Sequence, residues 1–246
     1  MEKTNKFEVT SMMLHILAMI FMLCDHLWAT IIPGNEWLTC IGRLALPIFA
    51  FLLVEGYFHT SNLKKYIQRL FIFAIISEIP FNLAVGSSVS YIVHQNILWS
   101  FLIGIGLIHL NEKAKKNGKV FVRILTGFGT IMLGFILGLI TFVDFNYAGI
   151  FTILTFYFFR GRKWWNYLFQ FLILLYINNE MIGGLGYEIS FRERTYFIHR
   201  QAFALLALIP IWLYKGKQGY NSKALQYSYY AFYPLHLLIL GLLKML

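Results

Sequence analysis

Ionisable side chains interrupt the two apolar runs between residues 11 and 60, and they are the residues best suited to chemistry. Asp25 and His26 lie near the end of the first run, and Arg43 follows the short turn at 33–36. Charged groups inside a run long enough to cross a bilayer are costly, so they usually face a cavity or one another and mark a site. A histidine held by a carboxylate can take a proton from an amine or hydroxyl, or carry an acyl group itself. An arginine nearby could stabilise an oxyanion or hold a phosphate.

Further polar residues fall at the same predicted end of later apolar runs. Glu78 precedes a proline in the third run, His94 and Asn96 open the fourth, and Asp144 lies in a short connection. We therefore predict that one outward-facing polar pocket could contain all of these side chains: Asp25, His26, Arg43, Glu78, His94, Asn96 and Asp144. For a single histidine inside a membrane, the alternative interpretation is a helix-packing contact.

The composition predicts a membrane protein. Of the 246 residues, 59% are hydrophobic and 13% are charged, whereas about a quarter of a soluble domain is charged. Apolar runs of about the length that crosses hydrocarbon recur along the chain. We expect a multi-pass protein of the cell membrane with one domain over 1–246, surrounded by the lipid bilayer. We ascribe the net charge of +10 to cytoplasmic connections and expect no nucleic-acid partner.

The elements that must position these residues are helices. We expect an all-α bundle of about nine transmembrane helices, near 11–32, 36–60, 66–86, 95–111, 121–142, 145–160, 164–179, 198–214 and 228–246. With the N-terminus in the cytoplasm, sixteen of the 21 Lys and Arg residues fall on the cytoplasmic side, as the positive-inside rule requires. The longest outer connection, 178–199, is predicted to be either a substrate-facing loop or a solvated connector.

Other chemistries have little support in the sequence. It contains no G-x-S-x-G elbow, no H-E-x-x-H motif and no cysteine pair at metal-binding spacing. Glu55 and His59 share a helical face toward the inner end of the second run and, with His15, could bind a metal, although we expect none. Cys24 and Cys40 are interpreted as small buried apolar residues.

Four phrases carry a family resemblance that extends from about residue 11 to residue 240. They are LHILAMIFMLCDHL, IGRLALPIFAFLLVEGYFHT, SEIPFNL and YYAFYPLHLLIL. Together they resemble the TraX family, named for the membrane protein that N-acetylates F-type pilin. That family is similar in turn to a wider group of multi-span acyltransferases, which includes acyltransferase-3 proteins and the heparan glucosaminide acetyltransferase.

The resemblance implies an enzyme that transfers an acyl group, most simply acetyl from acetyl-CoA, to an amine or hydroxyl acceptor at or across the membrane. The wider group uses a histidine near the end of an early helix, which His26 matches. Asp25 would then orient that histidine or tune its pKa, and Arg43 would bind the donor or stabilise developing charge. The remaining candidates, expected to bind substrate or cofactor, are Glu55, His59, Glu78, Asn96, Tyr233 and His236.

Two other classes of function stay open at this point. Buried acids and histidines also suit a small proton-coupled permease, although such transporters usually contain internal repeats and this sequence shows none. A non-catalytic partner in cell-surface assembly or export is the third interpretation.

Overall fold

The computed structural model describes residues 8–86, 88–89, 94–191 and 194–246, and this part of the chain is mostly helical. The α-helices are α1 (Ser11–Thr30), α2 (Glu36–Gly42), α3 (Ala45–His59), α4 (Leu63–Phe81), α5 (Ile97–Lys116), α6 (Val120–Ile140), α7 (Asn146–Phe158), α8 (Trp164–Tyr176), α9 (Leu208–Leu213) and α10 (Lys223–Lys244). Two π-helical turns, η1 (Asn82–Gly86) and η2 (Ile177–Ile182), extend α4 and α8, and the 3₁₀ helix η3 (Arg200–Ala207) leads into α9.

All nine segments expected to be helical contain helix, which confirms a mostly helical fold in the described part of the chain. Four of them are long and apolar enough to cross a membrane, namely Ser11–Thr30, Glu36–His59, Leu63–Gly86 and Val120–Ile140. Crossing by all nine segments, and a cytoplasmic N-terminus, stay predictions.

The segment expected as one span at 36–60 consists of two helices. The helix α2 ends at Gly42, and α3 begins at Ala45 after a turn in which Leu44 N–H bonds to the Ile41 carbonyl at 3.1 Å. Pro47 explains the break, because it has no N–H to donate to the carbonyl four residues earlier, that of Arg43. The interruption places Arg43 at a bend beside the end of α1.

Helix α3 is the centre of the bundle. Its side chains are buried on several faces, as at Ile48, Ala50, Leu53 and Val54, and it packs against α1, α5 and α7. A helix that is apolar all round belongs in the interior. By contrast, α6 and α8 expose large apolar side chains outward, as a surface in contact with lipid does. These exposed faces and the four long apolar helices indicate membrane association.

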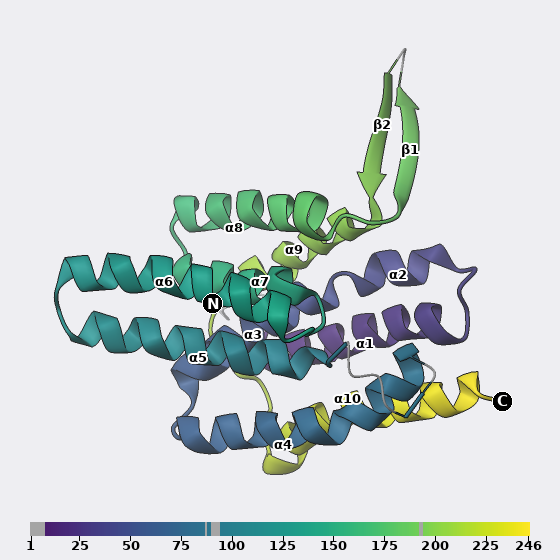
Figure 1. Ribbon diagram of the computed structural model, residues 1–246, viewed down its shortest axis with the longest axis horizontal. Helices are drawn as coiled ribbons and strands as arrows, with labels where there is room; N and C mark the ends of the chain where they lie inside the picture. The colour runs from purple at the N-terminus through teal and green to yellow at the C-terminus, as the bar shows by residue number, and fades with distance from the viewer. Residues whose placement is uncertain (1–7, 87, 90–93, 192–193) are drawn as a thin grey trace, which may run out of the picture.

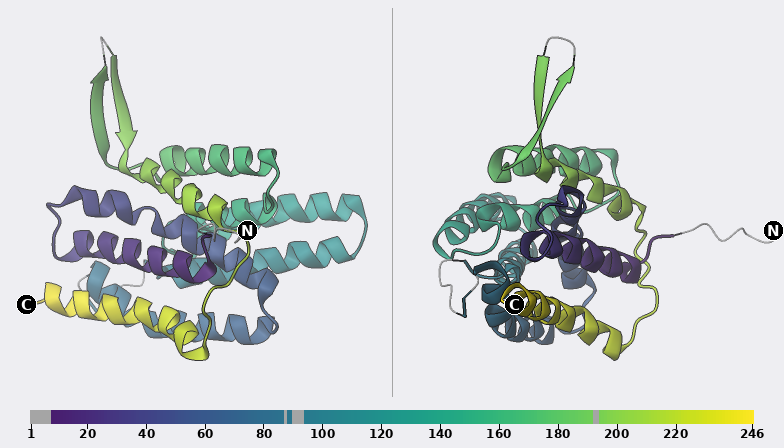
Figure 2. Two further views of the ribbon diagram at one scale, coloured as in Figure 1. Left: turned by 180° about the vertical axis from the view of Figure 1, so that it is seen from behind. Right: turned by 90° about the vertical axis from the view of Figure 1, so that its right-hand side faces the viewer.

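The helices lie with their long axes roughly parallel, and the connections gather at the two ends (Figure 1). The α5–α6 turn is at one end, and the α1–α2 turn and the C-terminus are at the other. Two strands, β1 (Gly186–Phe191) and β2 (Arg194–His199), form an antiparallel hairpin that stands across the helix axes in every view (Figures 1 and 2). The connection expected over 178–199 thus contains η2 and this hairpin, a regular structure that the sequence interpretation missed.

Candidate functional site

The centre of the candidate site is a pair of histidines from opposite ends of the chain. His26 lies one turn before the end of α1, and α10 brings His236 against it. The His26 Nδ1 and His236 Nε2 atoms are 2.6 Å apart. The two ring planes are inclined by only 13°, and the 4.9 Å between their centroids fits rings that meet edge to edge through these nitrogens. A single hydrogen bond therefore links the two imidazoles.

The neighbours of His236 determine where the protons lie. Its Nδ1 is 2.7 Å from the Phe232 carbonyl oxygen, which can only accept, so in the neutral ring Nδ1 carries the hydrogen. The His236 Nε2 atom is then an acceptor, and His26 Nδ1 must donate to it. This leaves an unprotonated Nε2 on His26. That nitrogen makes no hydrogen bond to any residue that the structure describes.

Asp25 points to a different set of partners on α2. Its Oδ1 atom accepts a 2.8 Å hydrogen bond from Thr39 Oγ1 and lies 3.3 Å from Arg43 Nη2. Arg43 Nη2 also donates to Thr39 Oγ1 at 2.6 Å. The Asp25 and Arg43 side chains each retain 20% exposure, so this triad borders open space. The His26 ring is hydrogen-bonded to His236. The family resemblance implied instead that Asp25 would orient this ring.

Gly42 allows α2 to approach α1 this closely. A Cβ atom built at Gly42 would lie 2.4 Å from the Asp25 Cβ and 2.8 Å from its Cα, closer than real carbon atoms approach. The absence of a side chain at this position therefore brings the Arg43 turn into contact with Asp25.

Asp144 reaches the same site from the α6–α7 connection. Its Oδ1 atom lies 3.1 Å from His94 Nε2, and its negative charge acts on both Asp25 and His26. The hydrogen bond to Asp144 raises the pKa of His94 above its ordinary value of 6.5. Two backbone hydrogen bonds of 2.8 Å join the segment before α5 to the α6–α7 connection. Gln95 N–H donates to the Phe142 carbonyl, and Asp144 N–H donates to the Gln95 carbonyl.

A second polar cluster adjoins this site. The Glu78 carboxylate of α4 accepts hydrogen bonds from the Asn96 side chain and, at 2.6 Å, from the Trp99 indole. Asn96 is fully buried and caps the start of α5. Because Glu78 and Asn96 satisfy each other, we interpret them as an anchor between α4 and α5. The charges of Glu78 and Asp144 both act on the hydroxyl of Tyr233, one turn before His236.

The polar residues predicted to share one end of the bundle thus form adjoining clusters, whereas two other candidates lie apart from them. Glu55 lies twelve residues after Arg43, about 18 Å further along the chain if helical throughout. It pairs with Arg160 at 2.6 Å and lies 3.6 Å from His59 Nδ1. This cluster is at the other end of α3, away from the histidine pair.

Sequence reasoning missed the role of Thr39 and the direct pairing of the two histidines. Nothing in the spacing of Thr39 distinguishes it from a packing residue. His236 did carry a signal, since it is a histidine in an apolar helix within a phrase that resembles the family. Its partner could not be found from the sequence, because 210 residues separate the two rings.

A hollow of about 780 Å³ lies elsewhere, between α5, α6, α7 and η2. Apolar side chains dominate its lining, with Lys115 and Arg123 also present, and His26 is not part of it. Among the described residues, no three His, Cys, Asp or Glu side chains form a group that could hold a metal ion.

Comparison with known proteins decides the family. A family model described as TraX protein matches residues 10–244, nearly the whole chain. The chain belongs to the TraX family. The matched range of this TraX chain includes His26, Arg43 and His236. It is 26% identical over 260 residues, 98% of each chain, to a protein of Dichelobacter nodosus described as "Probable fimbrial assembly protein FimC, serogroup H1". No solved structure matches this TraX chain.

Proposed function

We propose that this TraX protein is a membrane-bound acyltransferase in which His26 Nε2 is the general base. The observation that supports this most directly is the hydrogen-bonded chain from His26 Nδ1 through His236 to the Phe232 carbonyl. It fixes the His26 tautomer and leaves the reactive nitrogen with a free lone pair. A base must have its acceptor nitrogen oriented before substrate arrives, and this arrangement does so without using Asp25.

The proposed reaction follows from that lone pair. His26 Nε2 accepts a proton from the acceptor's amine or hydroxyl as that group attacks the thioester carbonyl of acyl-CoA, most simply acetyl-CoA. The C–S bond then breaks, and the imidazolium returns the proton to the leaving thiolate. While His26 is protonated, the nearby carboxylate charge of Asp144 stabilises it.

We propose that Arg43 stabilises the oxyanion. Its Nη2 atom is held by Thr39 and Asp25, whereas Nε and Nη1 make no hydrogen bond to a described residue. A guanidinium that is already fixed in place loses little freedom when it binds developing negative charge. We therefore assign Asp25 and Thr39 to positioning Arg43.

The donor has to approach from the cytosol under the predicted topology, which puts His26 toward the outer face. Lys64 and Lys65 are exposed at the opposite end of the bundle and suit the nucleotide phosphates of coenzyme A. Arg160 and Arg162 suit them less, since one pairs with Glu55 and the other bonds the Tyr214 carbonyl at 3.2 Å. The pantetheine arm would cross between helices.

One assay tests this proposal against its rivals. Membranes containing the wild-type protein, His26→Ala or His15→Ala are incubated with acetyl-labelled acetyl-CoA, and label in the acceptor and in the vesicle lumen is measured separately. His15 is the matched control, since it is on the same helix about 16 Å away and stacks on Tyr229 at 4.4 Å. We expect transfer in the wild type and in His15→Ala, and its loss in His26→Ala.

Uptake of label into the vesicle lumen without transfer to the acceptor would favour a permease over an enzyme. Absence of both would favour the second candidate, a non-catalytic role in assembling a surface fibre. The observation in favour of that candidate is the similarity to the Dichelobacter nodosus protein described as a probable fimbrial assembly protein. A chain of that class would retain its assembly role in the His26→Ala variant.

A further inference from the structure

The β1–β2 hairpin has two chemically different faces, and its register defines them. Residues directly opposite each other in an antiparallel pair share a face, and each successive pair along the strands points to the opposite face. Two cross-strand pairs, Tyr187 with Ile198 and Ile189 with Tyr196, are on one face, which also holds Arg194. We call these five residues the aromatic face. The other, mostly polar face holds Gly186, Glu188, Ser190, Thr195, Phe197 and His199.

The aromatic face is uncovered beyond Tyr187. Ile189, Tyr196 and Ile198 are 48%, 50% and 40% exposed, and an isolated two-stranded hairpin is marginally stable in water. On the polar face, Phe197 is the one large apolar side chain; it is 52% exposed, and its ring packs against His199 with centroids 4.8 Å apart. The aromatic face therefore presents several neighbouring apolar side chains that are available to another surface.

The base of the hairpin is fixed to the bundle beside the candidate site. The Tyr187 hydroxyl lies 3.4 Å from Cys40 Sγ, one residue from Thr39. Arg200, directly after β2, donates a 2.5 Å hydrogen bond to Glu36 and places its guanidinium over the Tyr187 ring. These contacts hold the strands across the helix axes at the end of the bundle where α1 ends (Figures 1 and 2).

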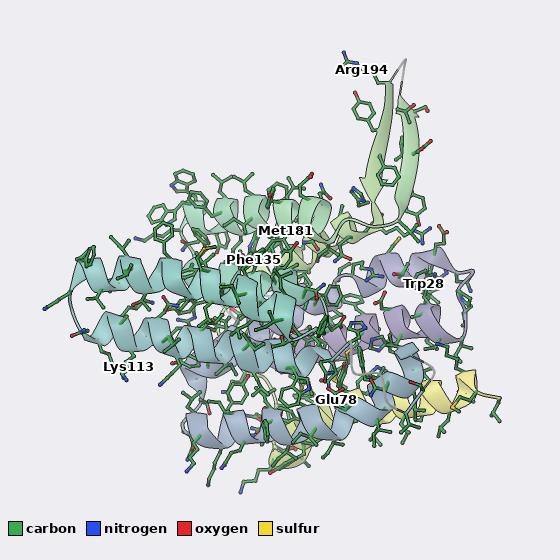
Figure 3. The ribbon with its side chains drawn as sticks, in the orientation of Figure 1. Trp28, Glu78, Lys113, Phe135, Met181 and Arg194 are labelled. Atoms are coloured by element: carbon green, nitrogen blue, oxygen red, sulfur yellow. The ribbon has the colours of Figure 1, made fainter. Side chains whose placement is uncertain are left out.

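Arg194 belongs to the aromatic face and is labelled in Figure 3, so it shows the direction in which this face points. Arg194 points from the tip of the hairpin to the side along which α8 runs, toward the end of the bundle that carries Lys113 (Figure 3). The aromatic face shares that direction by register. Below it, α8 exposes its own apolar surface, formed by Trp164, Phe169, Leu172 and Tyr176.

We infer that the hairpin binds the surface of the outer leaflet, with its aromatic face on the lipid. When the long helices lie along the membrane normal, the strands lie in the membrane plane, roughly at a right angle to α8 (Figure 1). Tyrosine is enriched at the boundary between headgroups and acyl chains, and an arginine there can bind lipid phosphate. The inference depends on the membrane embedding of the bundle and is independent of the proposed acyl transfer.

The test uses neighbouring positions on opposite faces as matched controls. In a protein with Cys24→Ala and Cys40→Ser, single cysteines are introduced as Ile189→Cys or Ser190→Cys, and as Tyr196→Cys or Thr195→Cys on the other strand. Each is labelled with an environment-sensitive fluorophore and reconstituted into phosphatidylcholine–phosphatidylglycerol vesicles. Quenching by spin-labelled lipid and by aqueous iodide is then compared.

We expect several-fold stronger lipid quenching at 189 and 196 than at 190 and 195, with iodide giving the opposite order. Equal iodide quenching at all four positions would overturn the inference, because the aromatic face would then be in water. Shielding of 189 and 196 from both quenchers, dependent on protein concentration, would also overturn it and would indicate a second copy of the chain on this face.

Discussion

Replacing His236 tests the proton arrangement on which the proposed chemistry depends. In His236→Leu the side chain keeps roughly its bulk but no longer accepts the hydrogen of His26 Nδ1. If the 2.6 Å bond contributes about 1.4 kcal/mol, its loss changes the population of the reactive His26 tautomer about tenfold. Without this bond the His26 ring is also less firmly oriented, which lowers the rate further. We expect kcat to fall about 10- to 100-fold, with the KM for acetyl-CoA changed by no more than about twofold.

The assay is acetyl transfer by purified protein in nanodiscs, with His236→Gln and His26→Ala/His236→Leu measured alongside. Glutamine can accept from His26 Nδ1 through its Oε1 atom, so His236→Gln should keep more activity than His236→Leu. Because His236 acts through His26, the double variant should be no slower than His26→Ala alone. A further drop in the double variant, or wild-type kcat in His236→Leu, would refute the reasoning.

Two further predictions concern how the site is held together. Gly42→Ala should lower the unfolding temperature by an amount equivalent to about 1–3 kcal/mol, because its Cβ would overlap Asp25. Gly34→Ala, where a Cβ would meet nothing within 4 Å, should have little effect by the same thermal scan, and equal effects would contradict the packing explanation. The second prediction uses pH. Because the Asp144 hydrogen bond raises the His94 pKa in the folded protein, its stabilisation is complete below about pH 6.5 and is lost as pH rises through the folded pKa. Thermal scans from about pH 5 to about pH 9 should show this loss in the wild type and not in Asp144→Asn.

The helical architecture could be predicted because it depends on local patterns. Apolar runs of sufficient length located every helical segment, and the alternation of basic connections matches the two ends of the bundle. The break at Arg43 could have been found from Pro47, whose missing N–H is a sequence property. The β-hairpin was harder to see, since its residues alternate over only a few positions, two glycines precede it and a third begins β1.

The sequence indicated which residues are candidates for the site, but it did not indicate which of them contact one another. The cost of placing Asp25, His26 and Arg43 in apolar surroundings identified them without any structure. Which carboxylate or ring each one contacts depends on how helices rotate about their axes, and sequence neighbours on a helix point about 100° apart. Asp25 and His26 therefore face different partners although they are adjacent.

The pairing of His26 with His236 has a consequence for biosynthesis. The ribosome adds roughly 5–20 residues per second, so His26 enters the membrane about 10–40 s before its partner, 210 residues later, has been made. A nascent or truncated chain lacking the last helix therefore holds an unaligned imidazole. If His26 is the base proposed above, a chain that ends before the last helix should not catalyse acyl transfer, because His236 is missing.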